Sequence, residues 1–169
     1  LHYYAKRFFA PVMVSCEEQN WMTAEANMNR EHFVYEKSIR LNVTNETLED
    51  KKVLVKWALR NADASVVKAE EREVTVPALS SVWLDKEEYP DVDVFGQYVS
   101  YEAWEGDTCI SEGSVIFSYP KYFHYLDPQL SYRIEGDEIV VSAKAYAKGV
   151  EILNLSEDLI LSDNYFDMS

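Results

Sequence analysis

Carboxylates are the most abundant side chains in this sequence that could do chemistry. The chain has 30 Asp and Glu residues against 16 Lys and Arg. Two glutamates lie in short motifs that invite a test as catalytic groups, Asn45-Glu46 and Ser111-Glu112-Gly113. Hydrolysis of a glycosidic bond needs two carboxyl groups that face each other across a sugar. Asn45-Glu46 falls in a polar link between two expected strands, and 30 acids produce such motifs by chance, so neither motif predicts a catalytic pair.

Other reactive side chains do not form a recognisable site. Cys16 and Cys109 are too few for a disulfide scaffold, and although they could form one bridge, a free buried cysteine is the commoner state. The histidines, His2, His32 and His124, are scattered without the spacing of zinc ligands. There is no Gly-rich phosphate loop and no serine or cysteine nucleophile arrangement. We therefore expect no metal and no cofactor.

Four tryptophans raise the question of sugar binding, because an exposed aromatic ring can stack on a pyranose. Trp57 lies on the apolar face of an expected strand and is predicted to fill the core. Trp104 lies opposite the apolar face of its strand, which favours a surface or an interface. Trp21, in a polar stretch, is the best candidate for an exposed ring and a sugar contact. Exposed aromatics more often mark a domain interface, so both interpretations of Trp21 stay open.

Asn42, Asn45 and Asn154 each begin an Asn-x-Ser/Thr tripeptide. These matches are frequent by chance and matter only in a secretory context.

The charge and hydropathy of the chain exclude two classes of partner. The net charge of −14 repels nucleic-acid phosphates and anionic lipid headgroups alike, so we expect no nucleic acid and no membrane as partner. There is no run of 18 apolar residues that could span a bilayer. With 47% hydrophobic and 14% aromatic residues, the chain can build a real core.

Hydrophobic periodicity predicts a short helix followed by many strands. Apolar residues in 1–10 recur at helical spacing, and Pro11 ends the helix. Two-residue alternation then begins, most clearly around Ile39–Val43 and Val53–Leu59, which the short polar link between them predicts to be an antiparallel hairpin. The further strands are expected at 11–16, 66–76 with a bend near 69–71, 81–85, 97–105 and 112–118, with a loop at 106–113. A short turn of helix is expected at 23–29.

These elements predict an all-β chain with an immunoglobulin-like antiparallel β-sandwich at 11–120. A linker with two prolines and four aromatics follows at 119–128, and then strands at 130–134, 138–145 and 150–155, the first two joined by a Gly136-Asp137 turn. A sandwich normally needs about 100 residues, so 121–169 is expected to be an incomplete second immunoglobulin-like sandwich. The helix at 1–10 is expected to be the tail of an upstream domain.

Two segments resemble β-mannosidases of glycoside hydrolase family 2. Residues 3–12, YYAKRFFAPV, match the junction at which the last barrel helix of that family passes into a strand. Residues 161–167, LSDNYFD, are similar to a segment of the family's last immunoglobulin-like domain. The resemblance implies that the chain is the C-terminal region of such an enzyme, namely the end of the barrel helix, the fourth domain and the start of the fifth.

The family removes terminal β-linked mannose with retention, using two glutamates on barrel strands. The resemblance therefore places both catalytic residues upstream of Leu1 and implies a non-catalytic accessory region that supports the barrel. The partner is the catalytic barrel of the same polypeptide, contacted by Tyr4, Phe8 and Phe9. The parent enzyme is expected to be a soluble periplasmic, lysosomal or extracellular protein. The alternatives to this accessory role are a carbohydrate-binding module, or a protein-interaction sandwich of another multidomain glycosidase.

Overall fold

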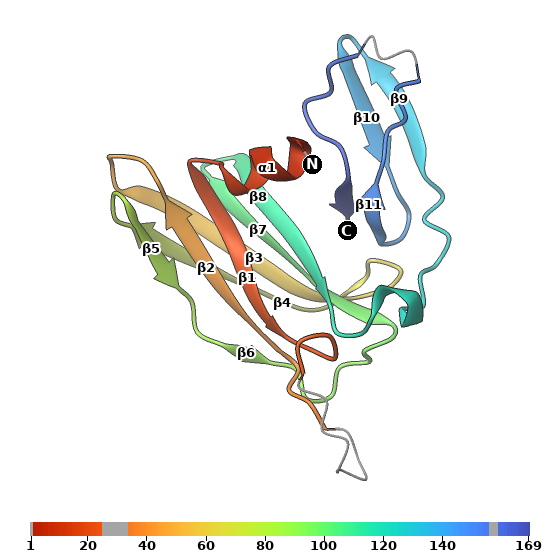
Figure 1. Ribbon diagram of the computed structural model, residues 1–169, viewed down its shortest axis with the longest axis horizontal. Helices are drawn as coiled ribbons and strands as arrows, with labels where there is room; N and C mark the ends of the chain where they lie inside the picture. Colours follow the sequence, from red (N-terminus) through yellow and green to blue (C-terminus); the bar gives the residue numbers. More distant parts are fainter. Residues whose placement is uncertain (1, 25–33, 156–158) are drawn as a thin grey trace.

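The computed structural model describes residues 2–24, 34–155 and 159–169. It begins with helix α1 (His2–Phe8), and strand β1 (Val12–Gln19) follows directly (Figure 1). The predicted helix at 1–10 is thus confirmed over its central residues. The helical turn expected at 23–29 falls mostly outside the described residues.

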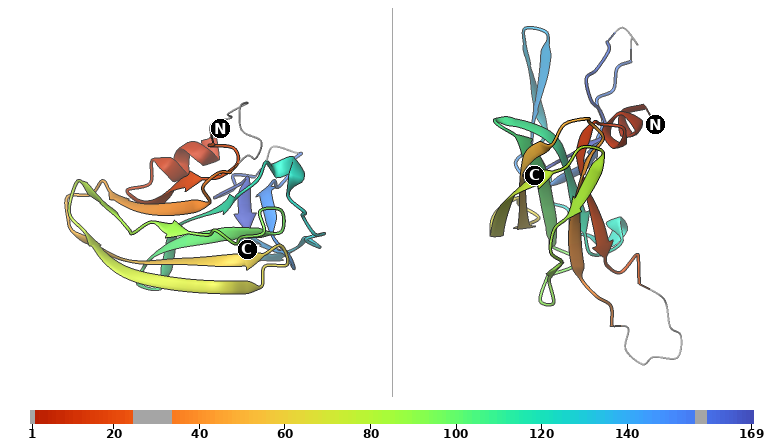
Figure 2. Two further views of the ribbon diagram at one scale, coloured as in Figure 1. Left: turned by 90° about the horizontal axis from the view of Figure 1, so that it is seen from below. Right: turned by 90° about the vertical axis from the view of Figure 1, so that its left-hand side faces the viewer.

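Two four-stranded antiparallel sheets form the body of the described chain, and their layers are seen edge-on in Figure 2. The first sheet has the order β1-β2-β5, with β6 also paired to β2. The second has the order β4-β3-β7-β8. Their bounds are β2 (Ser38–Asn45), β3 (Lys51–Asn61), β4 (Val66–Val76), β5 (Ser80–Trp83), β6 (Glu87–Glu88), β7 (Gln97–Glu105) and β8 (Thr108–Ile116). The predicted antiparallel sandwich is confirmed.

The core lies between the two sheets and consists of the alternate residues that the sequence pattern marks as apolar. Val43 of β2 and Val53, Val55 and Trp57 of β3 are buried there, with Val99 of β7. Burial of one such side chain contributes about 1.5–3 kcal/mol. The sheets are also linked at one edge, because the Val14 backbone N–H donates to Ser111 Oγ at 3.1 Å.

The predicted hairpin of Ile39–Val43 with Val53–Leu59 is wrong. β2 pairs with β1, β5 and β6, whereas β3 pairs with β4 and β7 in the opposite sheet. The link between β2 and β3 therefore crosses from one sheet to the other. Alternation shows which face of a strand is buried. It is the same whether two strands pair within one sheet or face each other across the core from opposite sheets, so it cannot identify the partner.

Two local predictions also need correction. The loop expected at 106–113 is shorter, since β8 begins at Thr108 after a turn in which Gly106 has φ of 59°. Glycine accepts this left-handed conformation without a Cβ clash. The irregularity expected at 69–71 lies instead at Val67, the extra residue between the β3–β4 pairs Arg60–Val66 and Leu59–Lys68.

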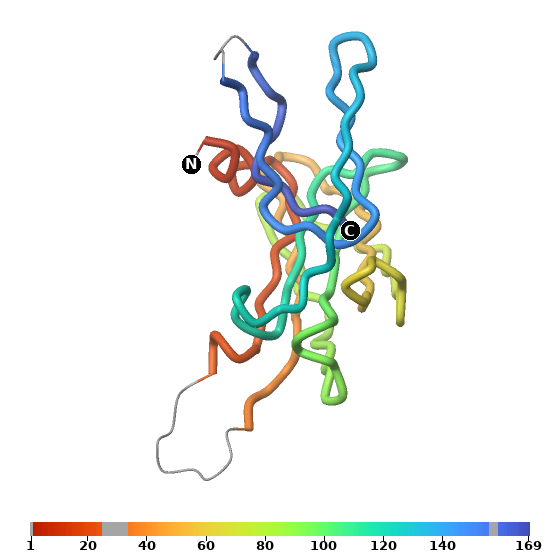
Figure 3. Tube along the Cα trace, turned by 90° about the vertical axis from the view of Figure 1, so that its right-hand side faces the viewer, coloured from red at the N-terminus to blue at the C-terminus, as the bar shows by residue number. Residues whose placement is uncertain are grey.

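The C-terminal residues form two small two-stranded sheets. β9 (Ser131–Glu135) and β10 (Glu138–Ser142) make the predicted hairpin, which projects away from the sandwich in Figure 3. β11 (Ala147–Val150) pairs with β12 (Phe166–Met168). The strand expected at 150–155 is wrong, because β11 ends at Val150 and its partner comes from the far end of the chain. A short 3-10 helix, η1 (Pro120–Tyr122), lies in the segment expected to be a linker.

A second, smaller core fixes these residues to the outer face of the β7–β8 pair. It is formed by the buried residues Ala62, Tyr98, Ile116, Phe123 and Tyr146. The rings of Tyr98 and Tyr146 stack with centroids 3.8 Å apart. The outer face of the second sheet is therefore partly covered by the chain's own C-terminal residues.

Candidate functional site

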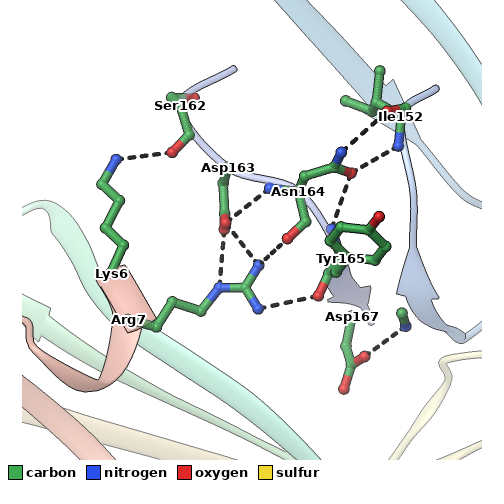
Figure 4. A network of polar contacts seen from close by, with 9 residues as sticks. Lys6, Arg7, Ile152, Ser162, Asp163, Asn164, Tyr165 and Asp167 are labelled. Carbon is green, nitrogen blue, oxygen red and sulfur yellow. Dashed lines mark hydrogen bonds and ion pairs between the residues drawn. The ribbon is translucent and has the colours of Figure 1, made fainter. Parts of the chain in front are cut away.

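The two ends of the described chain meet at one polar junction, shown in Figure 4. Arg7 of α1 donates from Nε and Nη2 to the two carboxylate oxygens of Asp163, at 3.2 and 2.7 Å. The same guanidinium donates to the Asn164 carbonyl at 2.7 Å and to the Tyr165 carbonyl at 3.0 Å. Lys6 Nζ reaches the Ser162 carbonyl at 2.8 Å. A planar guanidinium that binds one carboxylate with two donors fixes orientation as well as distance.

The receiving segment is held in shape by Asn164, which is buried. Its Oδ1 accepts from the backbone N–H of Ile152 at 2.7 Å, and its Nδ2 donates to the Ile152 carbonyl at 3.0 Å. The chain turns sharply after it, since Tyr165 has φ of 58°. A left-handed tyrosine is strained and persists only when its surroundings fix it. Arg7 therefore binds a segment whose shape is already set.

Asp167 continues the junction on the side of β8. Its carboxylate accepts from Lys148 Nζ at 2.8 Å and from the Gly149 backbone N–H at 2.8 Å. It also accepts a short hydrogen bond from Ser114 Oγ, and Ser114 is in turn 2.6 Å from the Tyr146 hydroxyl. The C-terminal segment is thus joined to α1 by Arg7 and to the sandwich by Asp167.

A cavity of about 810 Å³ lies between these elements, and we call it the junction cavity. Four acidic residues line it together with Arg7 and Lys148, namely Glu102, Glu112, Asp163 and Asp167. The aromatic residues Tyr4, Tyr101, Tyr165 and Phe166 also belong to its lining. Burial raises the pKa of Glu112, and the nearby carboxylates of Glu102 and Asp163 raise it further. Glu102 and Glu112 are paired directly across β7 and β8, a position in which like charges repel.

A family profile described as Mannosidase Ig/CBM-like domain matches residues 37–122, just over half of the chain. The chain belongs to this family. The resemblance to β-mannosidases noted from the sequence is thereby confirmed for the family of the sandwich. No curated protein sequence matches the chain.

Solved structures extend the likeness beyond the Mannosidase Ig/CBM-like domain itself. The β-D-mannosidase from Dictyoglomus thermophilum matches 99% of this chain and 19% of its own, with a TM-score of 0.74 and 18% identity. At that identity the match shows the fold, and it includes the helix and the C-terminal residues. A glycoside hydrolase family 2 β-glucuronidase has a TM-score of 0.44 and 10% identity, and the match covers 79% of this chain and 14% of the β-glucuronidase. A β-galactosidase from Bacteroides fragilis, described as putative, has a TM-score of 0.43 and 8% identity. That match covers 82% of this chain and 19% of the β-galactosidase. The chain spans about a fifth of the β-D-mannosidase it resembles.

Three aromatic residues in and directly after α1 lie on the outside of this region, as a contact surface requires. Tyr4, Phe8 and Phe9 are 49%, 53% and 79% exposed. Tyr4 also takes part in the junction, because its ring stacks on Tyr165 with a centroid distance of 6.3 Å and the Arg7 guanidinium lies 5.3 Å from it. Phe8 and Phe9 contact each other, with ring centroids 4.9 Å apart.

Trp21 lies at the opposite end of the sandwich and is half-buried in an aromatic cluster. Its ring is nearly parallel to that of Tyr122 at 5.4 Å, and Tyr119 meets it edge-on at 5.5 Å. Phe95 and Tyr35 lie at 6.4 Å. The expected core position of Trp57 is confirmed, and the tryptophan that is exposed, at 47%, is Trp83.

The two motifs tested for catalysis lie at different places in the sandwich, one at the end of β2 and the other on β8. Asn45 is fully buried, and its Nδ2 reaches the carbonyls of Glu49, Val76 and Pro77 at 2.8–3.1 Å. The Asn45 side-chain amide therefore fixes the link that passes from the first sheet to the second. Because it is buried, it is inaccessible for glycosylation in the folded chain. Glu112 lines the junction cavity, on a sandwich strand.

No group of three or more His, Cys, Asp or Glu side chains within the described residues could hold a metal ion, and Cys16 and Cys109 are both free. The described part of the chain contains no helix with the length and apolar character of a membrane span.

The sequence analysis missed the junction itself. Arg7 and Asp163 were noted only as members of two separate motifs, and nothing in the spacing predicted that they meet. The signal was present in those motifs, since residues 3–12 and 161–167 are the two stretches that resemble β-mannosidases and they are the two stretches that Arg7 joins.

Proposed function

We propose that this chain is a non-catalytic accessory region of a retaining β-mannosidase that supports the catalytic barrel. The observation that carries the proposal is the double use of α1. One side of the helix is fixed to the C-terminal segment by Arg7, while Phe8 and Phe9 are exposed and without a cover among the described residues. Exposed aromatic surface of this kind is typical of an interface.

The position of this surface suits a neighbour that is covalently attached to α1. Four further apolar side chains, Leu153, Leu155, Leu159 and Ile160, are 51–101% exposed in the connection that leads to Ser162. Lys6 and Arg7 hold the residues directly after that connection. We therefore infer a composite docking surface that is made by α1 and this connection, with the barrel of the same polypeptide as its partner.

The same reasoning supports the division of the chain. We propose the boundaries of the sequence analysis, with the barrel-helix tail at 1–10, one sandwich at 11–120 and an incomplete second sandwich at 121–169. The exposed side chains of the β9–β10 hairpin, with Tyr132 at 74% and Ile134 at 70%, support an incomplete second unit. Both catalytic carboxylates would then belong to the barrel.

We propose a packing role for Trp21 in place of a sugar contact. One face of its ring is covered by Tyr122, and the Lys121 ammonium lies 4.8 Å from the Tyr122 ring. A pyranose needs a free aromatic face, and the cluster leaves little of one.

Two measurements test the accessory role. The isolated chain should release no nitrophenol from an aryl β-mannoside, and turnover above the no-protein rate would refute the proposal. In the full-length polypeptide, Phe8→Asp with Phe9→Asp should lower the melting temperature of the barrel and leave that of the isolated chain unchanged. Leu79→Asp is the matched control, because Leu79 is also exposed, at 64%, but lies in the turn before β5. An equal effect of Leu79→Asp would contradict the docking surface.

A further inference from the structure

The β9–β10 hairpin has little cover among the described residues. It projects away from the sandwich in Figure 3, and β9 pairs with no described strand other than β10. Every residue of β9 is exposed, with Tyr132 at 74% and Ile134 at 70%. A two-stranded ribbon is only marginally stable in water, and three or more strands with an apolar face are needed for independent stability. The hairpin therefore lacks a neighbour that would widen its sheet.

The apolar side chains of the hairpin share one face. Ile134 of β9 is paired with Ile139 of β10, and Tyr132 is paired with Val141. Residues that are paired directly across two strands lie on the same side of the sheet, so these four side chains form one apolar surface. A second hairpin beside β9 would extend that surface.

The free edge of β9 is open to backbone pairing. Hydrogen bonding alternates along an antiparallel pair, so every second residue of β9 turns its N–H and C=O away from β10. Counted from the two-residue turn Gly136-Asp137, these residues are Tyr132 and Ile134. Neither a proline nor a shift of register interrupts the edge. Another extended strand can therefore add to β9.

The edge strand β4 of the sandwich is protected against such an addition. Its residues Lys68, Glu70 and Arg72 are paired with core-facing residues of β3, so three charged side chains lie on the inner side of that edge. Charges that point inward at an edge oppose pairing with a further strand. On β9 the corresponding apolar side carries Tyr132 and Ile134, which gives no such protection.

The charges of β9 select one way of pairing two copies of the chain. In an antiparallel pair centred on Ile134, Arg133 of each copy lies opposite Glu135 of the other. Glu135 is also paired with Glu138 of its own hairpin, and a cation from the second copy would offset that repulsion. A pair centred on Arg133 would oppose two guanidinium groups, and one centred on Glu135 would oppose two carboxylates. The strand is thus self-complementary about Ile134.

We propose that two copies of this chain associate through β9, in an antiparallel pair centred on Ile134 that forms a four-stranded sheet in the order β10-β9-β9-β10. The overlap comprises residues 132–136 of each copy, so each turn reaches the base of the other ribbon and the two sandwiches lie at opposite ends. The inference goes beyond the accessory role and does not depend on it, because only residues of this chain form the contact.

Sedimentation velocity of the chain at rising concentration tests the proposal. The overlap is short, so a weak dimer with a Kd of about 10–100 μM is expected. Arg133→Glu and Glu135→Arg should each leave the chain monomeric, because each change brings like charges together. An equimolar mixture of the two variants should dimerise, since each copy supplies the charge that the other lacks. The contact between Arg133 and Glu135 within one chain cannot explain that rescue, because both variants lose it.

Glu71→Arg is the matched control, because it makes the same charge change as Glu135→Arg at an exposed position of β4. It should leave the dimer intact, and an equal loss would show that net charge controls the association. A mixture of the two β9 variants that stays monomeric would reject the pairing, as would a wild-type chain that is monomeric at about 500 μM, well above the expected Kd.

Hydrogen exchange separates a second copy from cover by the chain itself. The backbone amides of Tyr132 and Ile134 should be protected at about 500 μM and exchange freely at about 5 μM, which lie on either side of the expected Kd. Equal protection at the two concentrations would mean that β9 is covered within its own chain, and the proposal would then fail.

Discussion

Arg7 and Asp163 form a two-donor ion pair between residues 156 positions apart in the sequence. The pair is partly exposed, with 35% and 44% of the two side chains accessible, so its charge attraction alone is weak. The guanidinium also donates to the backbone carbonyls of Asn164 and Tyr165. These two hydrogen bonds come in addition to the ion pair with the Asp163 carboxylate. Arg7 therefore orders the C-terminal segment more than a surface salt bridge would.

Substitution of Arg7 should loosen that segment. Arg7→Ala removes all four hydrogen bonds and should cost about 1–3 kcal/mol. Arg7→Lys should recover little of the loss, because an ammonium lacks the planar fork. Urea unfolding and hydrogen exchange of the amides at 162–167 measure the effect. Lys6→Ala, which removes one exposed bond, is the control and should cost less than about 0.5 kcal/mol. Equal protection of these amides in both variants would show that Arg7 has no special role.

Asn45 is the residue on which the crossing between the sheets depends. Its side chain is fully buried, and Oδ1 accepts from the backbone N–H and the hydroxyl of Thr47 at 2.9 and 2.7 Å. Asn45→Ala leaves buried backbone groups without partners and should cost about 2–4 kcal/mol in chemical unfolding. Asn154→Ala removes one bond in an exposed connection and should cost well under half as much. A similar loss for the two variants would contradict the anchoring role of Asn45.

How far the sequence predicts the fold depends on how each strand is stabilised. β7 was predicted with the bounds that the structure shows, Gln97–Glu105, because regular alternation places every second residue in the core. β12 was missed, because three residues that pair with a strand 16 positions earlier carry too little periodicity. The partner of β2 was predicted wrongly for a different reason, since alternation reports the buried face and is silent on the neighbouring strand.

The candidate site could be predicted less well than the fold. Phe8 and Phe9 could be named, because aromatic residues on a short amphipathic helix indicate a contact even without a known partner. The meeting of Arg7 with Asp163 could not, because it depends on how the second core positions the C-terminal residues against β8. That packing rests on Tyr98 and Tyr146, whose rings stack from elements with no common sequence pattern.

Gly113 should tolerate no side chain, although its backbone conformation is ordinary. A Cβ there would lie 2.5 Å from Cζ and 2.9 Å from Cε2 of Tyr101, which crosses β8 at this point. Gly113→Ala should therefore cost about 1–3 kcal/mol through overpacking. Thermal unfolding measures the loss. The double variant with Tyr101→Leu should lose less than the sum of the two single variants, and simple additivity would exclude this clash as the cause.

Glu112 should destabilise the fold at neutral pH. Burial and the neighbouring Glu102 raise its pKa in the folded chain, so the folded state holds the proton more tightly than the unfolded state. Its favourable contribution is full below the unfolded pKa and is lost as the pH rises through the folded pKa. Glu112→Gln should thus stabilise by about 0.2–1 kcal/mol at pH 7.

The gain from Glu112→Gln should shrink on acidification to about pH 3, more than one unit below the ordinary glutamate pKa, where both states of the wild type carry the proton. Unfolding by urea at the two pH values gives the difference. Glu73→Gln is the control, because Glu73 is an exposed partner of Lys52 on the same sheet, and this change should give no gain. A gain from Glu112→Gln that stayed constant with pH would show that its carboxylate charge is not the cause.

The two cysteines should differ in reactivity. Burial raises the pKa of the Cys16 thiol to about 12, and the carboxylate of Glu18 contributes to the rise. About one Cys16 in ten thousand is then a thiolate at pH 8, and the thiolate is the form that reacts. Burial also raises the pKa of Cys109, but this residue borders the open junction cavity. Iodoacetamide should therefore label Cys109 well before Cys16, as mass spectrometry of Cys16→Ser and Cys109→Ser can resolve. Faster labelling of Cys16 in the folded chain would mean that the contact between β1 and the core opens more readily than its packing indicates.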